Sequence, residues 1–422
     1  MTMRIRADLH VHSKYSRATS RDMEADTIAL WAKRKGLNLV GTGDFTHPAY
    51  LKELKQKLEP AADGLFTLRG SGSGVHFMLT TEISTIYAYQ GKTRRIHSLI
   101  TAPSFEAVDA INRELLRFGR LDYDGRPIFG FNVQDLVKLV MDVSDRCMLI
   151  PAHAWTPWYS VFGSKSGFDS LDECFGDQAR HIYAIETGLS SDPPMNWRVG
   201  ALDRITLISN SDAHSPEKLG REANVFECAM EYTEILSAIK AKDKKRFLYT
   251  IEFFPEEGKY HFDGHRACRI SFSPAQTRRH GGLCPVCRKP LTIGVLSRVD
   301  SLATRKDGGM PRNAIPFRHL LPLKEIIAGV LGTGTNTVKV SRLYTGAVID
   351  RGIPELDIVQ DLSASELRRL LPEDIAAGIL QVRRGMVTVS PGYDGEYGRV
   401  SLTPEQTGAR DKHFLKTYTN GG

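Results

Sequence analysis

The chain has 422 residues, more than the roughly 250 to 300 that one hydrophobic core usually supports, so its length predicts two or three domains and excludes a single small binding module. Hydrophobic residues make up 41% and charged residues 25%, which excludes wholesale disorder and a disulfide-dense scaffold. The first residues are too polar for a secretory signal, and no stretch approaches the roughly 18 consecutive apolar residues of a membrane span. With only six cysteines, we expect a cytoplasmic protein that has no membrane partner.

The net charge of +7 is concentrated in one stretch of the chain. Residues 264–344 hold 14 Lys and Arg against 3 Asp and Glu, whereas the rest of the chain holds 42 against 46. Such a block is typical of a surface that faces a polyanion. A solvated basic face without a partner is the alternative.

Short β-rich runs alternate with helical patterns over about the first 250 residues. We expect strands at residues 4–9, 37–42, 76–80, 148–151, 182–186, 205–209 and 247–254. Apolar residues recur at three- and four-residue steps at residues 24–35, 106–118, 133–143 and 233–241, which suits helices that cover a parallel sheet. Residues 70–74 contain three glycines and predict a loop. This alternation predicts an α/β domain with a barrel-like architecture.

The pattern changes after Pro255, where a stretch rich in Cys, His, Arg and Pro begins. Helical pieces at 323–331 and 364–371 follow, then a hairpin within 386–402. We therefore divide the chain into a barrel at 1–255, a small zinc-binding module at 256–300 and a mainly helical C-terminal domain at 301–422. The segment 331–337 could offer backbone amides to a phosphate, but it lacks the ending of a P-loop, so we favour an ordinary turn.

Nearly every predicted strand of the barrel ends in a potential metal ligand. His10 and His12 stand two residues apart on an extended segment, so their side chains point to the same side. Later strand ends supply Asp44, Glu82, His97, His153, Glu186, Asp212 and His214. A barrel gathers the carboxyl ends of its strands on one face. This large number of polar groups in one opening favours a multinuclear metal site over isolated polar residues. Asp8 is expected to hold a ligand histidine, and His47, His76 and His181 to be surface or packing residues.

This set resembles the polymerase-and-histidinol-phosphatase superfamily of phosphoesterases, with His-x-His near the start and a closing Ser-Asp-Ala-His. The resemblance implies a distorted seven-stranded α/β barrel that holds two or three divalent metals, Zn, Mn or Mg, and hydrolyses phosphate esters. Asp44 stands where a histidine is more common, and Arg17 where many members have an Asp. The resemblance implies a two-metal core of His10, His12, Glu82, His97, His153 and Asp212, with Asp44 and His214 as candidates for a third metal.

Residues 265–287 carry a second predicted metal site. His265, Cys268, Cys284 and Cys287 have the spacing of two zinc knuckles, and four protein ligands predict one structural Zn²⁺. His261 or His280 could replace His265. The other cysteines, Cys147, Cys174 and Cys228, lie in apolar contexts and are expected to be buried.

Basic residues surround these knuckles, and such a density of guanidinium groups suits contacts with nucleic-acid phosphates. The candidates are Arg266, Arg278, Arg279, Arg288, Lys289 and Arg298. Trp155, Trp158 and Tyr159, which follow His153, are candidate walls of a pocket for a base that has left the stack, and ordinary packing is the alternative.

Taken together, the chain is similar to the endonuclease Q family along almost its whole length, including Gly-Thr-Gly-Asp at 41–44 and Pro-Ala-His-Ala-Trp-Thr-Pro-Trp at 151–158. The resemblance implies a nucleoid-associated repair enzyme that cuts damaged duplex or single-stranded DNA on the 5′ side of hypoxanthine, uracil, xanthine or an abasic site. A small-molecule phosphatase and a non-catalytic DNA-binding protein are the alternatives. A sliding clamp is a possible partner, but residues 412–418 show no obvious clamp-binding peptide.

Overall fold

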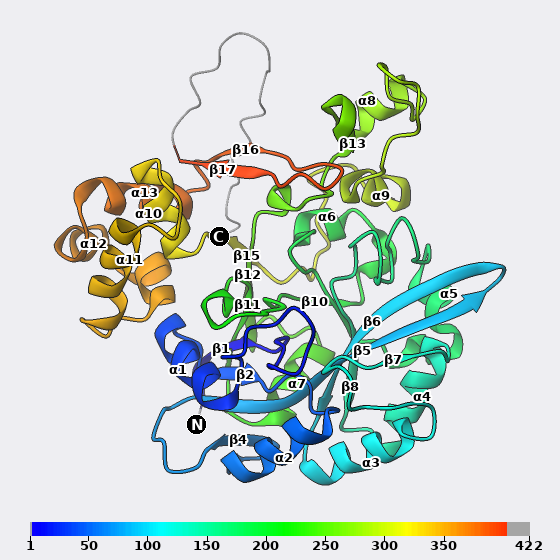
Figure 1. Ribbon diagram of the computed structural model, residues 1–422, viewed down its shortest axis with the longest axis vertical. Helices are drawn as coiled ribbons and strands as arrows, with labels where there is room; N and C mark the ends of the chain where they lie inside the picture. The colour runs from blue at the N-terminus through cyan, green and yellow to red at the C-terminus, as the bar shows by residue number, and fades with distance from the viewer. Residues whose placement is uncertain (1, 403–422) are drawn as a thin grey trace.

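The computed structural model describes residues 2–402, so the prediction about residues 412–418 lies outside the described residues. Figure 1 shows an α/β region that carries a projecting hairpin, a small region around α8 and β13, and a group of helices from α10 to α13. The α-helices are α1 Ala25–Lys35, α2 Pro48–Lys57, α3 Phe105–Leu115, α4 Val133–Val143, α5 Leu171–Phe175, α6 Pro193–Trp197, α7 Tyr232–Lys240, α8 Pro274–Arg279, α9 Val295–Leu302, α10 Leu323–Leu331, α11 Val338–Tyr344, α12 Ala364–Leu370 and α13 Glu373–Arg383. Short 3-10 helices are η1 Gly176–His181, η2 Gly200–Leu202, η3 Pro216–Lys218, η4 Pro255–Glu257 and η5 Arg266–Cys268, and π-helical turns are η6 Thr345–Ile349 and η7 Asp357–Asp361.

The α/β region is built on one large sheet with the hydrogen-bonded order β15-β12-β11-β1-β2-β5-β4-β3, to which β6, β7 and β8 are joined through β5 and β6. The strands are β1 Met3–Asp8, β2 Leu39–Gly41, β3 Leu58–Ala62, β4 Leu65–Leu68, β5 His76–Tyr89, β6 Lys92–Ala102, β7 Ile128–Phe129, β8 Met148–Pro151, β9 Ala184–Glu186, β10 Thr206–Ile208, β11 Ala223–Cys228, β12 Phe247–Glu252, β13 Asp263–His265, β14 Ile270–Phe272, β15 Phe317–His319, β16 Thr388–Ser390 and β17 Arg399–Ser401. All seven predicted strands are present, which confirms the α/β class.

The sheet is mixed, which corrects the expectation of a parallel one. β1 pairs in parallel with β2 and β2 with β5, but β11 runs antiparallel to both β1 and β12, and β5 and β6 form a long antiparallel hairpin. Gln90 and Gly91, at the tip of this hairpin, have φ angles of 48° and 73°. Positive φ at both central residues is the geometry of a two-residue turn that matches the twist of the flanking strands. The hairpin extends β5 well beyond the predicted residues 76–80 and forms the projecting arm in Figure 1.

A parallel pair, β9 and β10, closes the gap between β8 and β11. Ala154, just after β8, donates its backbone N–H to the carbonyl of Glu186 at 2.9 Å. On the other side, the Asn224 amide of β11 donates to the carbonyl of Ser209 at 2.7 Å. The strands that precede His12, Asp44, His153, Glu186 and Asp212 therefore end around one opening, as expected for a barrel.

Amphipathic helices cover the outside of the strands. α4 begins and ends at the predicted residues. One face of this helix is buried and consists of Val133, Leu136, Val137 and Val140. Asn132 caps its N-terminus, because the Asn132 side chain accepts the N–H of Asp135 at 2.8 Å. α1, α3 and α7 form within one to three residues of their predicted ends.

The region after the barrel returns to it. β15 pairs in parallel with β12 and so completes the edge of the barrel sheet, although its residues lie in the predicted C-terminal domain. One hydrophobic cluster then continues from the barrel into α10, α11 and α13. The predicted hairpin is present as β16 and β17. The segment 331–337 forms the turn between α10 and α11, and Gly332, at φ 62°, ends α10. The proposed domain boundaries at 255 and 300 remain predictions.

Within residues 2–402, none of the helices is both long enough and apolar enough to span a membrane.

Candidate functional site

Several predicted site residues occupy strained backbone positions at the ends of barrel strands. Asp44 after β2, His153 after β8 and Asp212 after β10 have φ angles of 45°, 31° and 47°. A side chain other than glycine rarely adopts positive φ, and such conformations persist where the surrounding structure enforces them, often at functional sites. The three turns direct these side chains into the opening that the strand ends share.

The first potential metal-binding group consists of His10, His12 and Asp212, whose ligand atoms lie within 4.8 Å of one another. The Asp212 Oδ1 atom lies 3.0 Å from His12 Nε2 and 3.7 Å from His10 Nε2. These three atoms are buried, and they make no good hydrogen bond to any part of the chain from residue 2 to residue 402. A buried cluster of such lone pairs fits a cation, because unpaired polar atoms in an interior are otherwise costly.

The second potential group consists of Glu82, His97 and His153, all buried. Glu82 Oε1 lies 2.7 Å from His97 Nδ1 and 3.0 Å from His153 Nε2. Its other oxygen, Oε2, lies 3.3 Å from His12 Nε2 and 3.7 Å from His10 Nε2. Glu82 therefore stands between the two groups and presents one oxygen to each.

Two buried carboxylates orient the histidines of the first group. Glu186 Oε2 accepts from His10 Nδ1 at 3.0 Å, and Asp44 Oδ1 accepts from His12 Nδ1 at 3.1 Å. In both rings the Nδ1 atom is engaged, which leaves Nε2 to face the site. Each carboxylate is itself fixed: Asn210 donates to Glu186 at 2.9 Å, and the hydroxyl and N–H of Ser13 each donate to Asp44 at 2.6 Å.

The remaining candidates lie at the edge of this constellation. His214 packs against the His12 ring with 4.5 Å between centroids, and its Nδ1 lies 2.9 Å from the carbonyl of Asp212. Asp44 and His214 do not belong to either potential metal-binding group. Asp8 accepts the backbone N–H groups of Ser211 and Gly220, so it fixes the loop of Asp212 instead of contacting a histidine.

The pKa values of the site's histidines shift in different directions. Burial favours the neutral imidazole of His10, but the charges of Glu186, Glu82 and Asp212 outweigh it and raise the pKa of His10 well above its usual value. Burial, reinforced by the charge of Arg126, lowers the pKa of His97 to about 4, although Glu82 opposes this shift. The pKa of Glu82 itself falls well below its usual range, because the charges of His97, Arg126 and His10 outweigh its burial. Glu82 is therefore ionised and His97 neutral near pH 7, whereas His10 would release its proton when a metal binds.

Arg126 is a residue of this site that the sequence did not reveal. Its guanidinium donates to Glu82 Oε2 at 3.0 Å, while 28% of its side chain remains exposed. Arg126 lies in the irregular loop between α3 and β7, away from the strands that carry the predicted ligands. Arg17 is 74% exposed and pairs with Asp124 at 3.3 Å on the outside of the same loop.

The aromatic candidates separate into buried and accessible residues. Trp155 is 1% exposed, donates its Nε1–H to Asn196 at 2.7 Å and packs on Phe162, so it belongs to the core and cannot line an open pocket as predicted. Trp158 is 36% exposed and meets the ring of Tyr260 edge to face. The ring of Tyr159 lies 4.7 Å from that of His97, next to the second metal-binding group.

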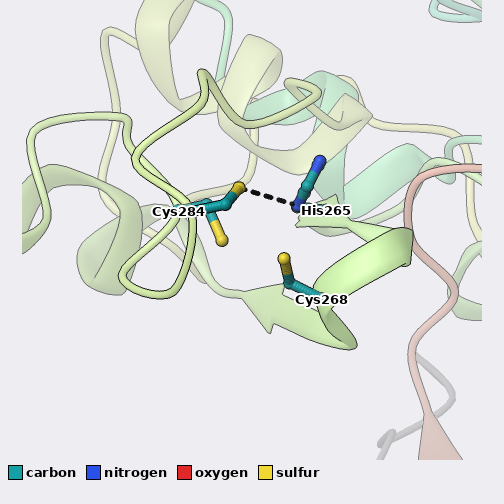
Figure 2. Close-up of side chains that lie close together, drawn as sticks. His265, Cys268 and Cys284 are labelled. Carbon is teal, nitrogen blue, oxygen red and sulfur yellow. Dashed lines mark hydrogen bonds between the residues drawn. The ribbon is translucent and has the colours of Figure 1, made fainter.

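The cysteine cluster has the geometry of a third metal site. Figure 2 shows the side chains of His265, Cys268 and Cys284 pointing toward one another from the end of β13, from η5 and from the loop after α8. Their ligand atoms and that of Cys287 lie within 4.8 Å of one another, and Cys287 Sγ is 3.5 Å from His265 Nδ1. Burial of the Cys284 sulfur is outweighed by the N–H groups of Cys287 and Val286, so the pKa of Cys284 falls to about 6. A thiolate at neutral pH suits zinc.

The other histidines near the knuckles take different roles in the fold. His261 is buried and stacks on Phe262, while the exposed His280 stacks on Phe272. Of the three histidines that the sequence left open, His265 is the one grouped with the cysteines.

The predicted phosphate-binding residues differ in how free their charges are. Arg279, Arg288 and Lys289 are exposed on the zinc module. Arg278 pairs with Asp300, and Arg266 with Glu396 at 3.3 Å. Arg298 donates to the carbonyls of Phe162 and Phe168 and to Asp169, so it joins the module to the barrel and its charge is partly neutralised.

Comparison with known proteins found no matching family model. An uncharacterized protein of Methanocaldococcus jannaschii is 31% identical over 302 residues, 69% of this chain, but the match spans only 36% of that protein's length. An uncharacterized protein of Bacillus subtilis is 28% identical over 413 residues, which cover 94% of this chain and 99% of that protein.

Two crystal structures resemble the whole chain. A lesion-specific endonuclease of the endonuclease Q type from Pyrococcus furiosus has a TM-score of 0.84 and 32% identity, with 96% of each chain covered. An endonuclease Q in complex with a 27-mer duplex substrate, with an abasic lesion at the active site, has a TM-score of 0.82 and 33% identity, with 96% of this chain and 98% of that chain covered. Because identity above 30% extends over nearly all of both chains in each pair, this chain belongs to the endonuclease Q family.

Proposed function

We propose that this protein is a metal-dependent DNA repair endonuclease, which hydrolyses the phosphodiester bond 5′ of hypoxanthine, uracil or xanthine and of abasic sites. The observation that carries the proposal is the position of Glu82 between two groups of buried histidines. That arrangement lies in a chain 33% identical to an endonuclease Q whose crystal structure holds a duplex with an abasic lesion at the active site.

We propose two catalytic metals. His10, His12 and Asp212 would hold one, His97 and His153 the other, and Glu82 would bridge them. When bound, such metals lower the pKa of a coordinated water and stabilise negative charge on the phosphate. The mixed nitrogen and oxygen ligands favour Zn or Mn over Mg, which prefers an all-oxygen shell. Asp44, which is committed to His12, and His214, at the rim, are weaker candidates for a third metal.

The residues of the chain itself would position these ligands. Glu186 and Asp44 hold the rings of His10 and His12 in one tautomer, with Nε2 toward the site. The strained backbone at His153 and Asp212 would keep those ligands in place when DNA binds, because the surrounding structure enforces it.

DNA would be held mainly outside the catalytic opening. The zinc module supports this role, because its four ligands fix a short segment that presents Arg279, Arg288 and Lys289 to solvent. A damaged base must leave the stack to be examined, and we propose Trp158 and Tyr159 as the walls that receive it. We expect the protein to act in the cytoplasm, at the nucleoid.

A cleavage assay with purified protein tests this function. A labelled duplex with one deoxyinosine is incubated beside the same duplex without damage and beside a chromogenic phosphate monoester. We expect one cut on the 5′ side of the deoxyinosine, dependent on divalent metal, and none in the undamaged duplex. Asp212→Ala should abolish cutting but retain DNA binding, because Asp212 holds a cation and the basic module holds DNA.

The alternatives give different results in the same assay. Hydrolysis of the monoester without DNA cleavage would indicate a small-molecule phosphatase. Binding to damaged DNA without hydrolysis of either substrate, with metal supplied, would indicate a binding protein. Unimpaired cutting by the Asp212→Ala variant would contradict the assigned metal site.

A further inference from the structure

The loop that contains Arg126 is fixed against the catalytic opening. The Asp124 carboxylate is buried and accepts the backbone N–H groups of Arg17 at 3.3 Å and Arg126 at 3.2 Å. Gly125 donates its N–H to the carbonyl of Tyr15 at 3.0 Å and accepts the hydroxyl of Thr46 at 3.1 Å. The loop is therefore held by its backbone on both sides of Gly125.

Gly125 shows how closely this loop approaches the site. A Cβ atom at this position would overlap the carboxylate of Asp44 and the hydroxyl of Ser16, both of which surround the His12 ring. Only glycine allows the backbone so near. The next residue, Arg126, consequently starts from a fixed point at the edge of the opening.

The Arg126 guanidinium is a permanent positive charge beside Glu82, at the edge of the candidate metal groups. One of its NH₂ groups donates to Glu82 Oε2 at 3.0 Å, and the charges of Glu82, Asp212 and Asp124 outweigh its partial burial and keep it protonated. Among residues 2–402, Glu82 is the one side chain to which this guanidinium is hydrogen-bonded. A guanidinium has five N–H donors, so further donors remain for a ligand, and 28% of the side chain is exposed.

The surroundings indicate what these donors would bind. Four buried or partly buried carboxylates, Asp44, Glu82, Glu186 and Asp212, form the inner part of the opening, so a phosphodiester that enters needs positive charge from the metals and from nearby cations. Arg126 is 28% exposed, whereas Glu82 is fully buried behind it. A planar guanidinium matches two phosphate oxygens at once. Arg126 is thus a partly exposed cation that contacts the fully buried Glu82 carboxylate.

We propose that Arg126 is a further catalytic residue of this site, which binds a non-bridging oxygen of the scissile phosphate through its free N–H groups while its other end holds Glu82. This assignment rests on the proposed function. Arg126 forms no covalent bond and transfers no proton; it stabilises the negative charge that the phosphate carries in the transition state.

The test compares Arg126→Ala and Arg126→Lys with a matched control, Arg120→Ala, which removes an exposed arginine paired with Asp122 a few residues earlier. Three quantities are measured: bound metal by elemental analysis, the affinity of the metal-loaded protein for inorganic phosphate by calorimetry, and the single-turnover rate on the deoxyinosine duplex. We expect Arg126→Ala to retain its metal, to bind phosphate about 10-fold more weakly and to cut about 100-fold more slowly. Arg126→Lys should recover part of both losses, and Arg120→Ala should match the wild type.

Other results would contradict either the assignment of Arg126 or the proposed function. Unchanged phosphate affinity and rate in Arg126→Ala would overturn the assignment. Loss of bound metal from Arg126→Ala and Arg126→Lys alike would overturn it too, because the residue would then only support Glu82. If the wild-type protein cuts no damaged duplex, the proposed function fails, while the phosphate titration still decides whether Arg126 binds phosphate.

Discussion

Lys35, in the last turn of α1, and Glu355, in the C-terminal helical region, form an ion pair of 2.6 Å in which both side chains are almost completely buried. The pair joins residues 320 positions apart in the sequence. Glu355 also accepts the hydroxyl of Tyr344 at 2.8 Å and the N–H of Leu323 at 2.9 Å. Nearby, Arg6 of β1 pairs with Asp357 and Asp361. The helical region is therefore attached to the barrel through buried charges as well as through the shared core.

Lys35→Met should destabilise the protein by about 3–5 kcal/mol, because it leaves the buried Glu355 carboxylate without its positive partner. Denaturant unfolding at pH 7 measures this change. Lys138→Met, which breaks an exposed pair with Asp142 on α4, is the control and should cost about 0.5 kcal/mol or less. Equal midpoints for the two variants would mean that the buried pair does not hold the helical region in place.

Glu186→Gln should weaken metal binding by about 10- to 100-fold without removing a metal ligand. The amide lacks the negative charge that orients His10 through its Nδ1–H and supports its basicity. Competition with a chelator measures the affinity, and Glu173→Gln, on α5 and in none of the potential metal-binding groups, is the control. An affinity equal to that of the wild type would show that the tautomer of His10 is fixed by other contacts.

Cys284→Ser should lose one equivalent of zinc and lower the stability of the module, since structural zinc supplies folding free energy. Elemental analysis of the purified protein gives the zinc content. Cys147→Ala also removes a buried thiol, but one outside the cluster, so its zinc content should stay at the wild-type value. Unchanged zinc in the Cys284→Ser protein would require another set of ligands.

Arg279 and Arg288 should contribute to DNA affinity through phosphates. Replacing both with Ala should reduce the slope of log binding constant against log salt concentration by up to about 1.8 in magnitude. Each neutralised phosphate of B-DNA contributes about 0.9 to that slope. Damaged and undamaged duplexes should weaken alike, because phosphate contacts carry no base identity. Binding of both duplexes is titrated at several salt concentrations, with Arg117 and Arg120, exposed on the barrel, replaced as the control pair.

The outcomes of that titration are distinct. Unchanged curves would indicate that the basic face is only solvated. A loss confined to the damaged duplex would indicate that these arginines read the lesion itself.

Glu252 should make the stability of the protein fall as the pH rises. Burial, followed by the charge of Asp192, raises the pKa of Glu252 to about 8, and the buried Glu222 across the strand pair also has a raised pKa. Above the ordinary carboxyl pKa the unfolded chain releases the proton of Glu252 while the folded protein retains it. The stability that this proton provides is fully present below about pH 4.5 and is lost by about 1.4 kcal/mol per pH unit up to about pH 8.

Glu252→Gln removes this proton-binding group, so the stability of the variant relative to the wild type should increase from pH 5 to pH 8, roughly as the wild type loses stability. Urea unfolding at several pH values measures the difference. Glu114→Gln, at the exposed end of α3, should show a constant difference over the same range. A constant difference for Glu252→Gln as well would mean that its carboxylate is ionised in the folded protein.

The sequence alone determined the α/β class, the presence of all seven predicted strands and the spacing of the His and Cys residues that form the third potential metal site, because each depends on local periodicity or on residues close in the chain. It also located His10, His12 and Glu82, although Glu82 lies within β5 and not at a strand end as predicted, because β5 continues to Tyr89 as one arm of the hairpin. The role of each residue within that set depended on distances that no local pattern encodes.

Only the tertiary structure decided which residues share a potential metal-binding group, which orient a histidine and which leave the site. Glu186 and Asp44 have the residue types of metal ligands, yet both accept hydrogen bonds from histidine Nδ1 atoms. Trp155 lies two residues from His153 but points into the core, because the positive φ of His153 turns the chain after β8. Arg126 comes from a loop without periodicity, and its contact with Glu82 joins residues 44 positions apart. Such contacts arise when distant segments pack together, and packing is a property of the whole chain.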